Sequence, residues 1–286
     1  MKKQKTWFVT GASKGLGLSL VKQLLAAGYN VAATSRNAAE LNNAVGNPND
    51  EFLPLEMNIK SEQSVAEAIS VTVKHFGKID VVVNNAGYGM LGSLEELSEE
   101  ETYDNFAVNV FGSLNVIRKA MPHLRAQGSG HIFNIASIGG FTGDFPGFGI
   151  YCATKFAVHG FTESLAAEIK EFGVHATVVS PGYFRTDFLT SGSMTVPSNP
   201  IEEYKSVRDS QNFHENEMNG NQGGDPDKAA LAMIKISEVE NPPVHLFLGE
   251  DAYNLAYKKI ENVKNELEAW KEVTFSTGYD VQAVDK

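Results

Sequence analysis

Tyr151 and Lys155 have residue types and a spacing that suggest chemistry. They lie four residues apart in a segment with helical periodicity, so a helix places both side chains on one face. A free tyrosine has a pKa of about 10, too high for a base at neutral pH. A nearby ammonium lowers that pKa because it favours the phenolate. The pair predicts that Tyr151 acts as a catalytic acid and base. A tyrosine and a lysine at this spacing more often lie on the exposed surface of a helix and have no catalytic role.

Two more polar residues are candidates for the same site. Ser137 follows an apolar run that ends at Ala136, and its hydroxyl can hold a substrate oxygen beside Tyr151. Asn109 lies in a long helical segment, where it can hold a water molecule that links Lys155 to solvent. A serine after a strand is usually a cap or a turn, and periodicity alone singles out neither residue. The hypothesis depends on the combination.

A glycine-rich turn, TGASKGLG at residues 10–17, stands where the first predicted strand meets the first predicted helix. Glycines permit a tight turn, and a helix N-terminus offers N–H groups to an anionic pyrophosphate. A similar turn without a ligand is the competing interpretation, but the position after the N-terminal strand favours a dinucleotide site. The expected cofactor contacts are Gly11, Ser13, Lys14, Gly15, Leu16 and Gly17.

The end of the second predicted strand carries no carboxylate for the adenosine ribose, which NAD enzymes usually provide there. A 2′-phosphate would instead meet the Ser35 hydroxyl and the guanidinium of Arg36, whose fork suits a phosphate. Lys14 adds a second cation from the glycine turn. Each cation taken alone is most simply a solvated surface group, but together they predict NADP(H) rather than NAD(H).

Taken in order, these motifs resemble the short-chain dehydrogenase/reductase family over about residues 5–190. The matching features are TGASKGLG, the run Asn84-Asn-Ala-Gly87, Asn109, Ser137, the run YCATK and Pro181-Gly182. The resemblance implies a Rossmann fold with a catalytic tetrad of Asn109, Ser137, Tyr151 and Lys155. In this family the tyrosine donates the proton to the carbonyl during reduction, and the lysine also holds the nicotinamide ribose.

The resemblance also implies further cofactor contacts at Asn58, Asn85, Ala86, Gly87, Pro181, Gly182, Phe184 and Thr186. The NNAG run shapes the sheet edge near adenine and ribose, and Thr186 aligns with a residue that holds the nicotinamide carboxamide. Two positions depart from the family pattern. Asn58 stands where an aspartate often touches adenine, and we expect its amide to have a similar role. Phe184 stands where valine or isoleucine is common, which predicts a bulkier local pocket.

Short apolar runs alternate with helical stretches, which predicts βαβ units in a parallel, doubly wound α/β sheet of the Rossmann type. The runs are continuously apolar, as expected for strands covered on both faces. The expected strands are Thr6–Thr10, Asn30–Ser35, Phe52–Leu55, Ile79–Val83, His131–Ala136, Ala176–Val179 and Val244–Leu248. The expected helices are Gly15–Ala27, Ala38–Val45, Ser61–Phe76, Glu99–Leu124, Tyr151–Phe172, Pro226–Ile236 and Ala252–Lys271.

The alternation stops after Pro181. Residues 184–224 carry clusters of Thr, Ser, Asn, Pro and Gly, with a weak helix near Ile201–Ser210. A break this long inside a compact domain usually marks a functional loop, so we expect a lid. The sequence shows neither repeats nor a dividing linker, which predicts one NADP-binding domain over residues 1–286. Its extension over residues 225–286 caps the pocket, forms an oligomer contact or blocks one. Members of the family that the chain resembles are commonly dimers or tetramers, and the sequence leaves the oligomeric state open.

The composition limits the class of protein. A formal net charge of −11, from 24 basic and 35 acidic residues, argues against nucleic-acid and polybasic membrane-surface partners. No segment approaches the ~20 apolar residues of a membrane span, and the histidines show no metal-ligand spacing. The single cysteine, Cys152, precludes an intrachain disulfide, which fits a reducing cytoplasm. We expect a cytoplasmic enzyme without a metal.

Apolar residues flank the predicted tetrad at Phe141, Phe145, Phe148, Phe184, Phe188 and Leu189. If several face the nicotinamide, the substrate is an apolar or aromatic ketone or aldehyde; packing of the lid or the core explains them equally well. His214, in the irregular segment, is placed where it could reach the site, but we expect a solvated loop histidine.

The favoured function is interconversion of a carbonyl and an alcohol on a small, hydrophobic molecule by an NADP-dependent enzyme. One alternative is reduction of a carrier-bound 3-oxoacyl thioester, which the acidic charge disfavours because an acidic carrier needs a basic docking patch. The other is a non-catalytic NADPH sensor, since a fold alone does not establish catalysis. The intact tetrad argues against the sensor.

Overall fold

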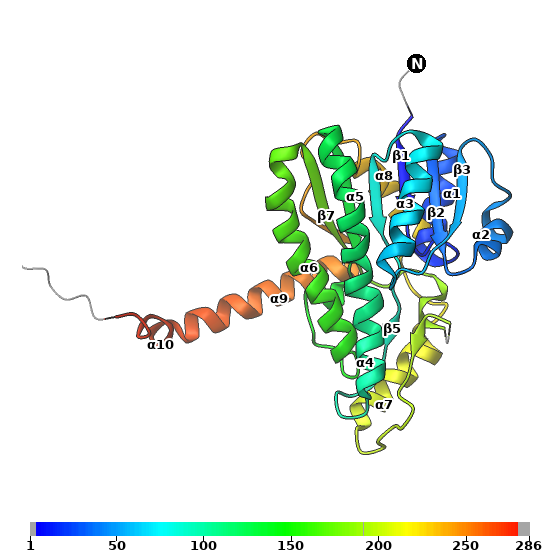
Figure 1. Cartoon of the computed structure of the whole chain (residues 1–286). Coiled ribbons are helices and arrows are strands. Elements are labelled where there is room, and N and C mark those ends of the chain that lie inside the picture. Colours follow the sequence, from blue (N-terminus) through cyan, green and yellow to red (C-terminus); the bar gives the residue numbers. More distant parts are fainter. Residues whose placement is uncertain (1–3, 191, 280–286) are drawn as a thin grey trace, which may run out of the picture.

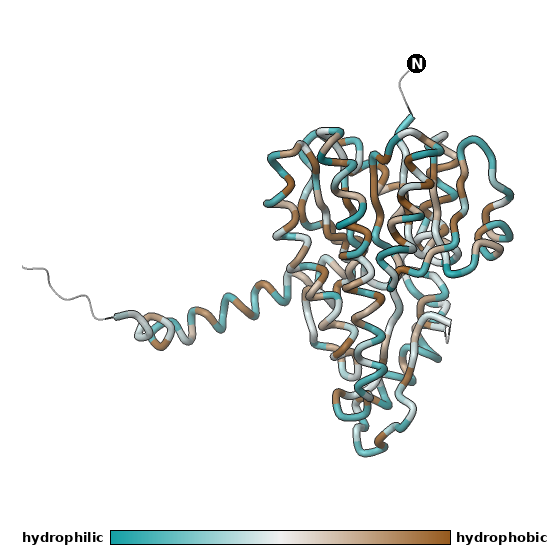
Figure 2. The backbone as a smooth tube through the Cα atoms, viewed as in Figure 1, coloured by the Kyte–Doolittle hydropathy of each residue, from teal (hydrophilic) through white to brown (hydrophobic). Residues whose placement is uncertain are grey.

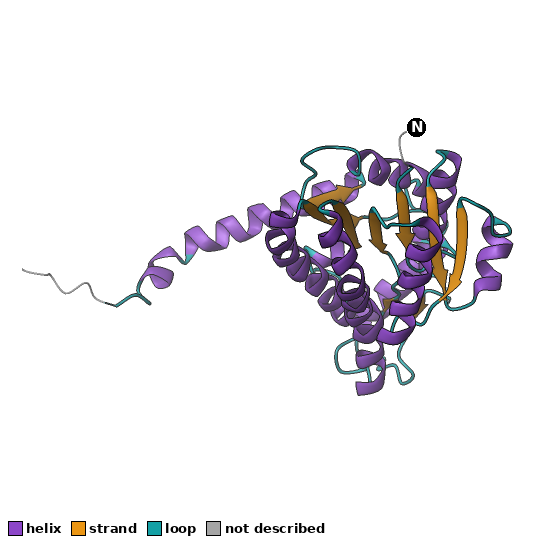
Figure 3. Ribbon diagram, turned by 45° about the horizontal axis from the view of Figure 1, so that its top comes forward, coloured by secondary structure: helices purple, strands orange, loops and turns teal. Residues whose placement is uncertain are grey.

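Seven parallel strands form one sheet in the computed structural model, which describes residues 4–190 and 192–279. The spatial order is β3-β2-β1-β4-β6-β7-β9, so the chain winds outward in both directions from β1 and β4 (Figure 3). This order confirms the doubly wound Rossmann-type sheet. The strands are β1 (Thr6–Val9), β2 (Asn30–Ser35), β3 (Phe52–Glu56), β4 (Val81–Asn84), β6 (Gly130–Ile135), β7 (Val174–Pro181) and β9 (His245–Leu248).

Helices cover both faces of the sheet (Figure 1). Helices α1, α2 and α8 pack on one face, and α3, α5 and α6 pack on the other. The bounds are α1 (Gly15–Ala26), α2 (Ala38–Val45), α3 (Glu62–Phe76), α4 (Glu99–Phe106), α5 (Ser113–Gln127), α6 (Gly149–Ile169), α7 (Lys205–Asn212), α8 (Pro226–Ile236), α9 (Glu250–Ala269) and α10 (Lys271–Phe275). Among the described residues, no helix is long and apolar enough to span a membrane.

Strand β1 shows why the predicted strands read as continuous apolar runs. Successive side chains of a strand point to opposite faces. Trp7 and Val9 pack in the core under α1 and α8, whereas Phe8 packs in the core under α3 and α5. All three are fully buried. A strand in the middle of such a sheet has no solvent face, so no position in it favours a polar residue.

The prediction of one regular helix over Glu99–Leu124 is wrong. Helix α4 ends at Phe106, a π-helical segment follows over Ala107–Gly112, and α5 then begins at Ser113. The segment presses against the β3–α3 connection, where a Cβ on Gly112 would lie 2.9 Å from the Ile59 side chain. The other predicted strands and helices of the sheet and its two layers exist, with ends displaced by up to three residues.

Residues 184–224 contain more regular structure than predicted. Strand β8 (Met194–Thr195) pairs in parallel with β5 (Gly89–Met90). The helix predicted near Ile201–Ser210 lies instead at α7 and continues into a π-helical segment, Phe213–Met218. An isolated bridge joins Phe184 to Gly224, so the segment leaves and rejoins the body at one place.

Helix α9 starts on the body and then leaves it. Ala252 and Ala256 are buried against the body, but every described residue from Ile260 to Tyr279 is exposed. Figure 1 shows α9 and α10 extending away from the sheet, and we call residues 257–275 the arm. Where it leaves the body, the start of the arm borders a hollow of about 510 Å³, which Lys259 and Glu266 line together with Phe156 of the body.

Candidate active site

The turn between β1 and α1 requires glycine for reasons visible in its geometry. Gly11 and Gly15 have φ values of +64° and +59°, in the left-handed region that favours glycine. A Cβ on Gly11 would also lie 2.7 Å from the Cα of Ala86. Lys14 precedes α1 without capping it through its side chain, which leaves the first N–H groups of the helix available. Such a terminus suits an anionic phosphate.

The NNAG run supports this turn from the next strand. The Asn85 amide donates to the carbonyl oxygens of Thr10 and Gly11, at 2.9 and 2.8 Å. The Thr10 hydroxyl accepts hydrogen bonds from the backbone N–H groups of Asn85 and Ala86, at 3.0 and 3.1 Å. On another side of the turn, the Cβ of Thr186 lies 3.7 Å from where a Cβ of Gly15 would be. Folding thus joins three motifs that are far apart in the sequence.

The residues predicted to bind the adenosine 2′-phosphate differ in their exposure and in the protein groups that they already contact. Arg36 is exposed just after β2, whereas Ser35 is buried and its hydroxyl lies 3.4 Å from a carboxylate oxygen of Glu40. The Lys14 ammonium donates to the backbone carbonyl of Gly192 at 2.6 Å, which ties the glycine turn to the 184–224 segment. Asn58 is exposed after β3 and its side chain accepts the N–H of Lys60 at 3.1 Å.

Helix α6 presents Tyr151 and Lys155 to one site, as their spacing predicts. Both are buried, and the Lys155 Nζ lies 5.7 Å from the centre of the Tyr151 ring. The same ammonium donates to the carbonyl of Ile135 at 2.9 Å. Ser137 follows β6, and its hydroxyl lies near the Tyr151 ring: a Cβ on Gly139 would lie 3.6 Å from the Ser137 Oγ and 3.8 Å from the Tyr151 Cε1. The N–H of Gly139 donates to the Ser137 Oγ at 3.1 Å and fixes that side chain.

Burial determines the protonation states of this pair. It raises the pKa of Tyr151, and the hydroxyl of Ser137 offsets only part of the rise. Burial also lowers the pKa of Lys155 to about 8, because the ammonium has left water. At neutral pH the phenol therefore keeps its proton and most of the lysine is charged. A protonated phenol beside a hydroxyl and an ammonium can donate a proton to a carbonyl oxygen.

Asn109 lies in the π-helical segment, a type of turn often found at functional sites. Its amide accepts the N–H of Tyr88 at 3.0 Å and donates to the Tyr88 carbonyl at 3.0 Å and to Thr154 Oγ1 at 3.1 Å. A Cβ on Gly87 would lie 3.0 Å from the Asn109 Oδ1 and 3.5 Å from the Lys155 Nζ. Asn109 thus fixes the backbone of the NNAG run beside the lysine.

The aromatic residues around the predicted tetrad divide into two groups. Phe148 and Phe188 lie with ring centres 6.1 and 5.9 Å from that of Tyr151, and Phe145 and Leu189 pack in the same cluster. Phe141 packs instead on the Phe247 ring, with centres 5.2 Å apart. Phe184 packs in the core under α1 and α8. Phe141 and Phe184 are therefore structural, and the remaining four surround Tyr151.

His214 is buried, so the prediction of a solvated loop histidine is wrong. Its Nδ1 lies 2.7 Å from the Ser210 carbonyl, which can only accept, so Nδ1 carries the proton. Its Nε2 then accepts the hydroxyl hydrogen of Tyr183 at 2.8 Å. The histidine ring lies 4.8 Å from that of Phe148, and the Tyr183 phenol is near enough to raise the pKa of Tyr151. The pair adds polar groups to a predominantly apolar wall.

Asp251 is a second residue that the sequence did not single out. Its carboxylate accepts the N–H of Tyr183 at 2.7 Å. A Cβ on Gly182 would overlap this carboxylate, which explains the glycine after Pro181. The C-terminal extension therefore reaches the site through the first turn of α9, and it fixes the backbone that follows β7.

Folding also brings together His159, Glu163 and His245, whose potential metal-ligand atoms lie within 4.8 Å of one another. The spacing of the histidines in the sequence does not indicate this group, because His245 joins the α6 residues only in the tertiary structure. The His159 ring is already engaged, however. Its Nε2 lies 2.9 Å from the Ser180 hydroxyl, and the ring also bonds to the backbone of Ser137. Its contacts support the strand ends behind the site.

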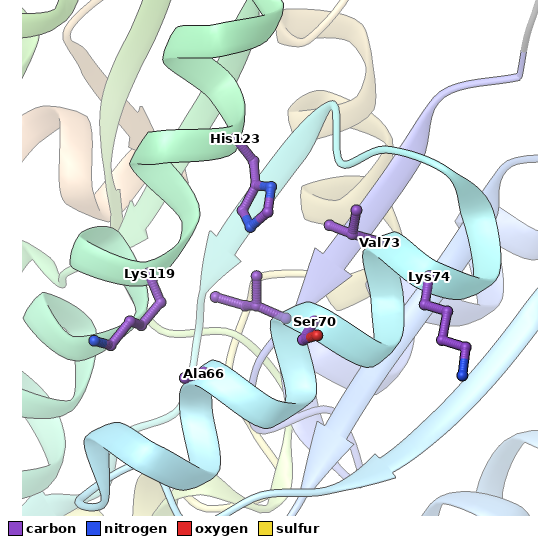
Figure 4. A pocket seen from close by; sticks show the side chains of 7 residues that line it. Ala66, Ser70, Val73, Lys74, Lys119 and His123 are labelled. Atoms are coloured by element: carbon purple, nitrogen blue, oxygen red, sulfur yellow. The ribbon is translucent and has the colours of Figure 1, made fainter.

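Figure 4 shows a hollow in a different part of the molecule. It has a volume of about 350 Å³ and lies between α3 and α5. Its lining residues are Ala66, Ile69, Ser70, Val73, Lys74, Lys119 and His123. None of the motif residues lines it, so it is separate from the candidate active site.

A family model described as short chain dehydrogenase matches residues 5–195. The match contains the glycine turn, the NNAG run and all four residues of the predicted tetrad. The chain belongs to the short-chain dehydrogenase family. It is thereby an NAD(P)-dependent oxidoreductase, as the motifs predict.

Two curated short-chain dehydrogenase relatives cover most of the chain. Oxidoreductase BOA17 from Botryotinia fuckeliana is 35% identical over 96% of this chain and 99% of its own length. A 3-ketodihydrosphingosine reductase from Bacteroides thetaiotaomicron is 34% identical over 84% of this chain and 86% of its own length. Both match beyond the region of the family model, so the likeness includes the 184–224 segment.

Solved short-chain dehydrogenases have the same fold. One from Streptomyces avermitilis superposes with a TM-score of 0.89 at 32% identity, over 98% of this chain and 100% of that one. A 3-ketoacyl-(acyl-carrier-protein) reductase from Brucella melitensis, solved with NADH, has a TM-score of 0.70 at 28% identity, over 85% and 96%. ElxO, solved with NADP, has a TM-score of 0.70 at 26% identity, over 85% and 96%. These neighbours support a nicotinamide cofactor.

Proposed function

We propose that the chain reduces a carbonyl compound to an alcohol with NADPH, using Tyr151 as the proton donor. The observation that carries the proposal is the meeting of the half-buried Ser137 with the buried Tyr151 and Lys155, at the end of β6 and the start of α6. A bound nicotinamide would supply the hydride. Ser137 holds the carbonyl oxygen, the phenol gives that oxygen its proton, and the ammonium stabilises the phenolate that remains.

The preference for NADPH rests on the end of β2. Arg36 offers an exposed guanidinium directly after the strand, and neither it nor Asn37 is the acidic residue that a ribose diol would need. Ser35 and Lys14 complete the predicted set, although both side chains already have protein partners at 3.4 and 2.6 Å. Arg36 is therefore the principal determinant of the proposed preference.

The proposed substrate is mainly hydrophobic and carries a second polar group. Phe148, Phe188 and Leu189 supply an apolar wall around Tyr151. The hydrogen-bonded pair of Tyr183 and His214 supplies a polar point in that wall, and the phenol oxygen still has lone pairs with which to accept. Residues 184–224 carry Phe188, Leu189 and His214, so we propose that they form the lid of one NADP-binding domain.

Reduction of a 3-oxo compound is the second candidate. It is favoured by the relative named 3-ketodihydrosphingosine reductase, at 34% identity. A 3-oxo group places a second oxygen two carbons from the reacting carbonyl, which suits the polar pair beside Tyr151. The net charge of −11 argues against an acidic carrier protein as the bearer of that group.

The test compares NADPH oxidation by the wild-type protein and by Tyr151→Phe, over a panel of ketones, aldehydes and 3-oxo esters. The variant should lose at least 1,000-fold in kcat, a loss of about 4 kcal/mol of transition-state stabilisation, while its Kd for NADPH stays within twofold. Tyr103→Phe is the matched control, because that tyrosine is 65% exposed on α4. A Tyr151→Phe variant that turns over normally would refute the proposal.

A further inference from the structure

The arm exposes large hydrophobic side chains that the body does not cover. Ile260 is 52% exposed, Leu267 is 60% exposed and Trp270 is 65% exposed. Figure 2 shows hydrophobic residues continuing along α9 after it leaves the body. A single helix of this length is only marginally stable in water without tertiary packing. The arm therefore has the properties of one half of an interface.

The spacing of these residues identifies the kind of partner. Hydrophobic residues along α9 and at its C-cap recur at alternating intervals of three and four, at Tyr253, Ala256, Ile260, Val263, Leu267 and Trp270. Ala256 is buried against the body, and the other five are exposed. The spacing is the heptad pattern of a and d positions, in which Tyr253, Ile260 and Leu267 are a positions. Such a seam fits another helix with the same repeat, because each side chain inserts between four residues of its neighbour.

The side chains of this seam are complementary to those of a second copy whose arm runs antiparallel to the first. An antiparallel second copy sets Ile260 against Val263, and in the same register it sets the exposed Tyr253 against the exposed Trp270. The flanking Lys259 then meets Glu266 of the second copy, twice by symmetry. A parallel copy would instead bring Lys259 against Lys264, two like charges. The charges therefore favour the antiparallel pair.

A lipid surface fits the arm less well. Membrane-surface helices concentrate Lys and Arg on their polar face. The polar face here mixes Lys258 and Lys264 with Glu261 and Glu268, and the whole chain has a net charge of −11. Neither feature attracts an anionic membrane.

We propose that the arm is a self-association element, which pairs antiparallel with the arm of a second copy of this chain in a two-fold symmetric interface. Such an interface buries the same patch on both copies. About 20 Å of α9, at 1.5 Å per residue for the 13 residues from Tyr257 to Ala269, would lie along the partner. Nothing in this association requires a particular cofactor or substrate.

The first experiment measures the mass of the full-length protein in solution by light scattering and sedimentation. The wild type should have at least twice the 31.1 kDa mass of one chain. Leu267→Glu should halve the measured mass because it places a charge in the seam. Asn265→Glu is the matched control, since it adds the same charge two residues away at an outer position and should leave the mass unchanged. Binding of NADPH verifies that each variant is folded.

A charge exchange tests the direction of pairing. Lys259→Glu should raise the dissociation constant of the arm contact about tenfold, because it sets two glutamates against each other. Glu266→Lys should do the same, and the double variant should restore the wild-type value. A wild type with the mass of one chain overturns the proposal, as does an unchanged mass for Leu267→Glu. Tighter association of Lys259→Glu would indicate parallel pairing and refute the antiparallel arrangement.

Discussion

At the scale of single residues, the candidate site depends on groups whose ordinary properties are changed by burial. Lys155 is 5% exposed and Tyr151 is 8% exposed. Removal from water disfavours the charged form of each, so the pKa of the phenol rises and the pKa of the ammonium falls. The hydroxyl of Ser137 opposes the first of these shifts. The sequence predicts the residue types but not their burial.

The pKa of Lys155 leads to a prediction about pH. Burial brings that pKa from 10.5 to about 8, so the ammonium loses its proton more than two units earlier than a free lysine does. The value of kcat/KM for NADPH-dependent reduction should therefore fall about tenfold for each unit above pH 8. Lys155→Arg retains its charge and should keep its own, lower, activity constant to pH 10. A wild-type profile that stays flat to pH 10 would contradict this assignment.

Arg36 allows a second prediction at this scale. Removal of one charge-assisted hydrogen bond costs about 1.5–3 kcal/mol, so Arg36→Ala should raise KM for NADPH roughly 10- to 100-fold and change KM for NADH little. Steady-state kinetics with both cofactors measure the difference. Lys22→Ala is the control, since Lys22 is an exposed cation on α1 and belongs to none of the motifs. Equal effects on the two cofactors would exclude a contact with the 2′-phosphate.

At the scale of elements, the 184–224 segment is held to the body by buried polar contacts. The Glu96 side chain is fully buried and accepts the backbone N–H of Ile201 at 2.7 Å. It also accepts the N–H of Ser93 at 2.6 Å and pairs with the Arg208 guanidinium at 2.8 Å. Burial alone would raise the pKa of Glu96, but the N–H groups of Ile201 and Ser93 and the charge of Arg208 together lower it. The carboxylate is therefore ionised and joins Ile201 and α7 to the loop before α4.

Loss of this contact should loosen the segment without unfolding the sheet. In Glu96→Ala the N–H of Ile201 loses its acceptor and Arg208 loses its counter-charge. Amide hydrogen exchange over residues 201–212 should accelerate at least tenfold, while β1, β4 and β6 keep their protection. Glu100→Ala serves as the control because Glu100 is exposed on α4. Unchanged exchange in the segment would show that Glu96 does not hold it.

At the scale of the whole molecule, the body and the arm have separate properties. The body contains the sheet, both helical layers and all the motif residues, whereas the described residues beyond Ile260 are exposed. The arm begins after Asp251, the residue that fixes Tyr183 and Gly182. The first turn of α9 therefore supports the candidate active site, whereas the arm beyond it has a part only in the proposed self-association.

A truncation after Lys259 separates the two properties. It keeps Asp251 and the buried residues of α9 but removes most of the seam. The shortened protein should have half the wild-type mass and a kcat within twofold of the wild type, because no described motif residue lies beyond Lys259. Mass measurement together with steady-state kinetics checks both parts. A large fall in kcat at unchanged mass would contradict the division.

The sequence by itself determined the α/β alternation, the glycine turn and the pairing of Tyr151 with Lys155. These are local properties: a strand covered on both faces must be apolar at every position, and four residues make about one helical turn. The tertiary structure alone decided the burial of His214, the contact of Asp251 with the backbone after β7 and the meeting of His159 with His245. Each joins residues from different elements, and no periodicity in the chain encodes such distances. The π-helical turn at Asn109 also lay outside prediction, because neighbouring residues such as Ile59 act on it from elsewhere in the chain.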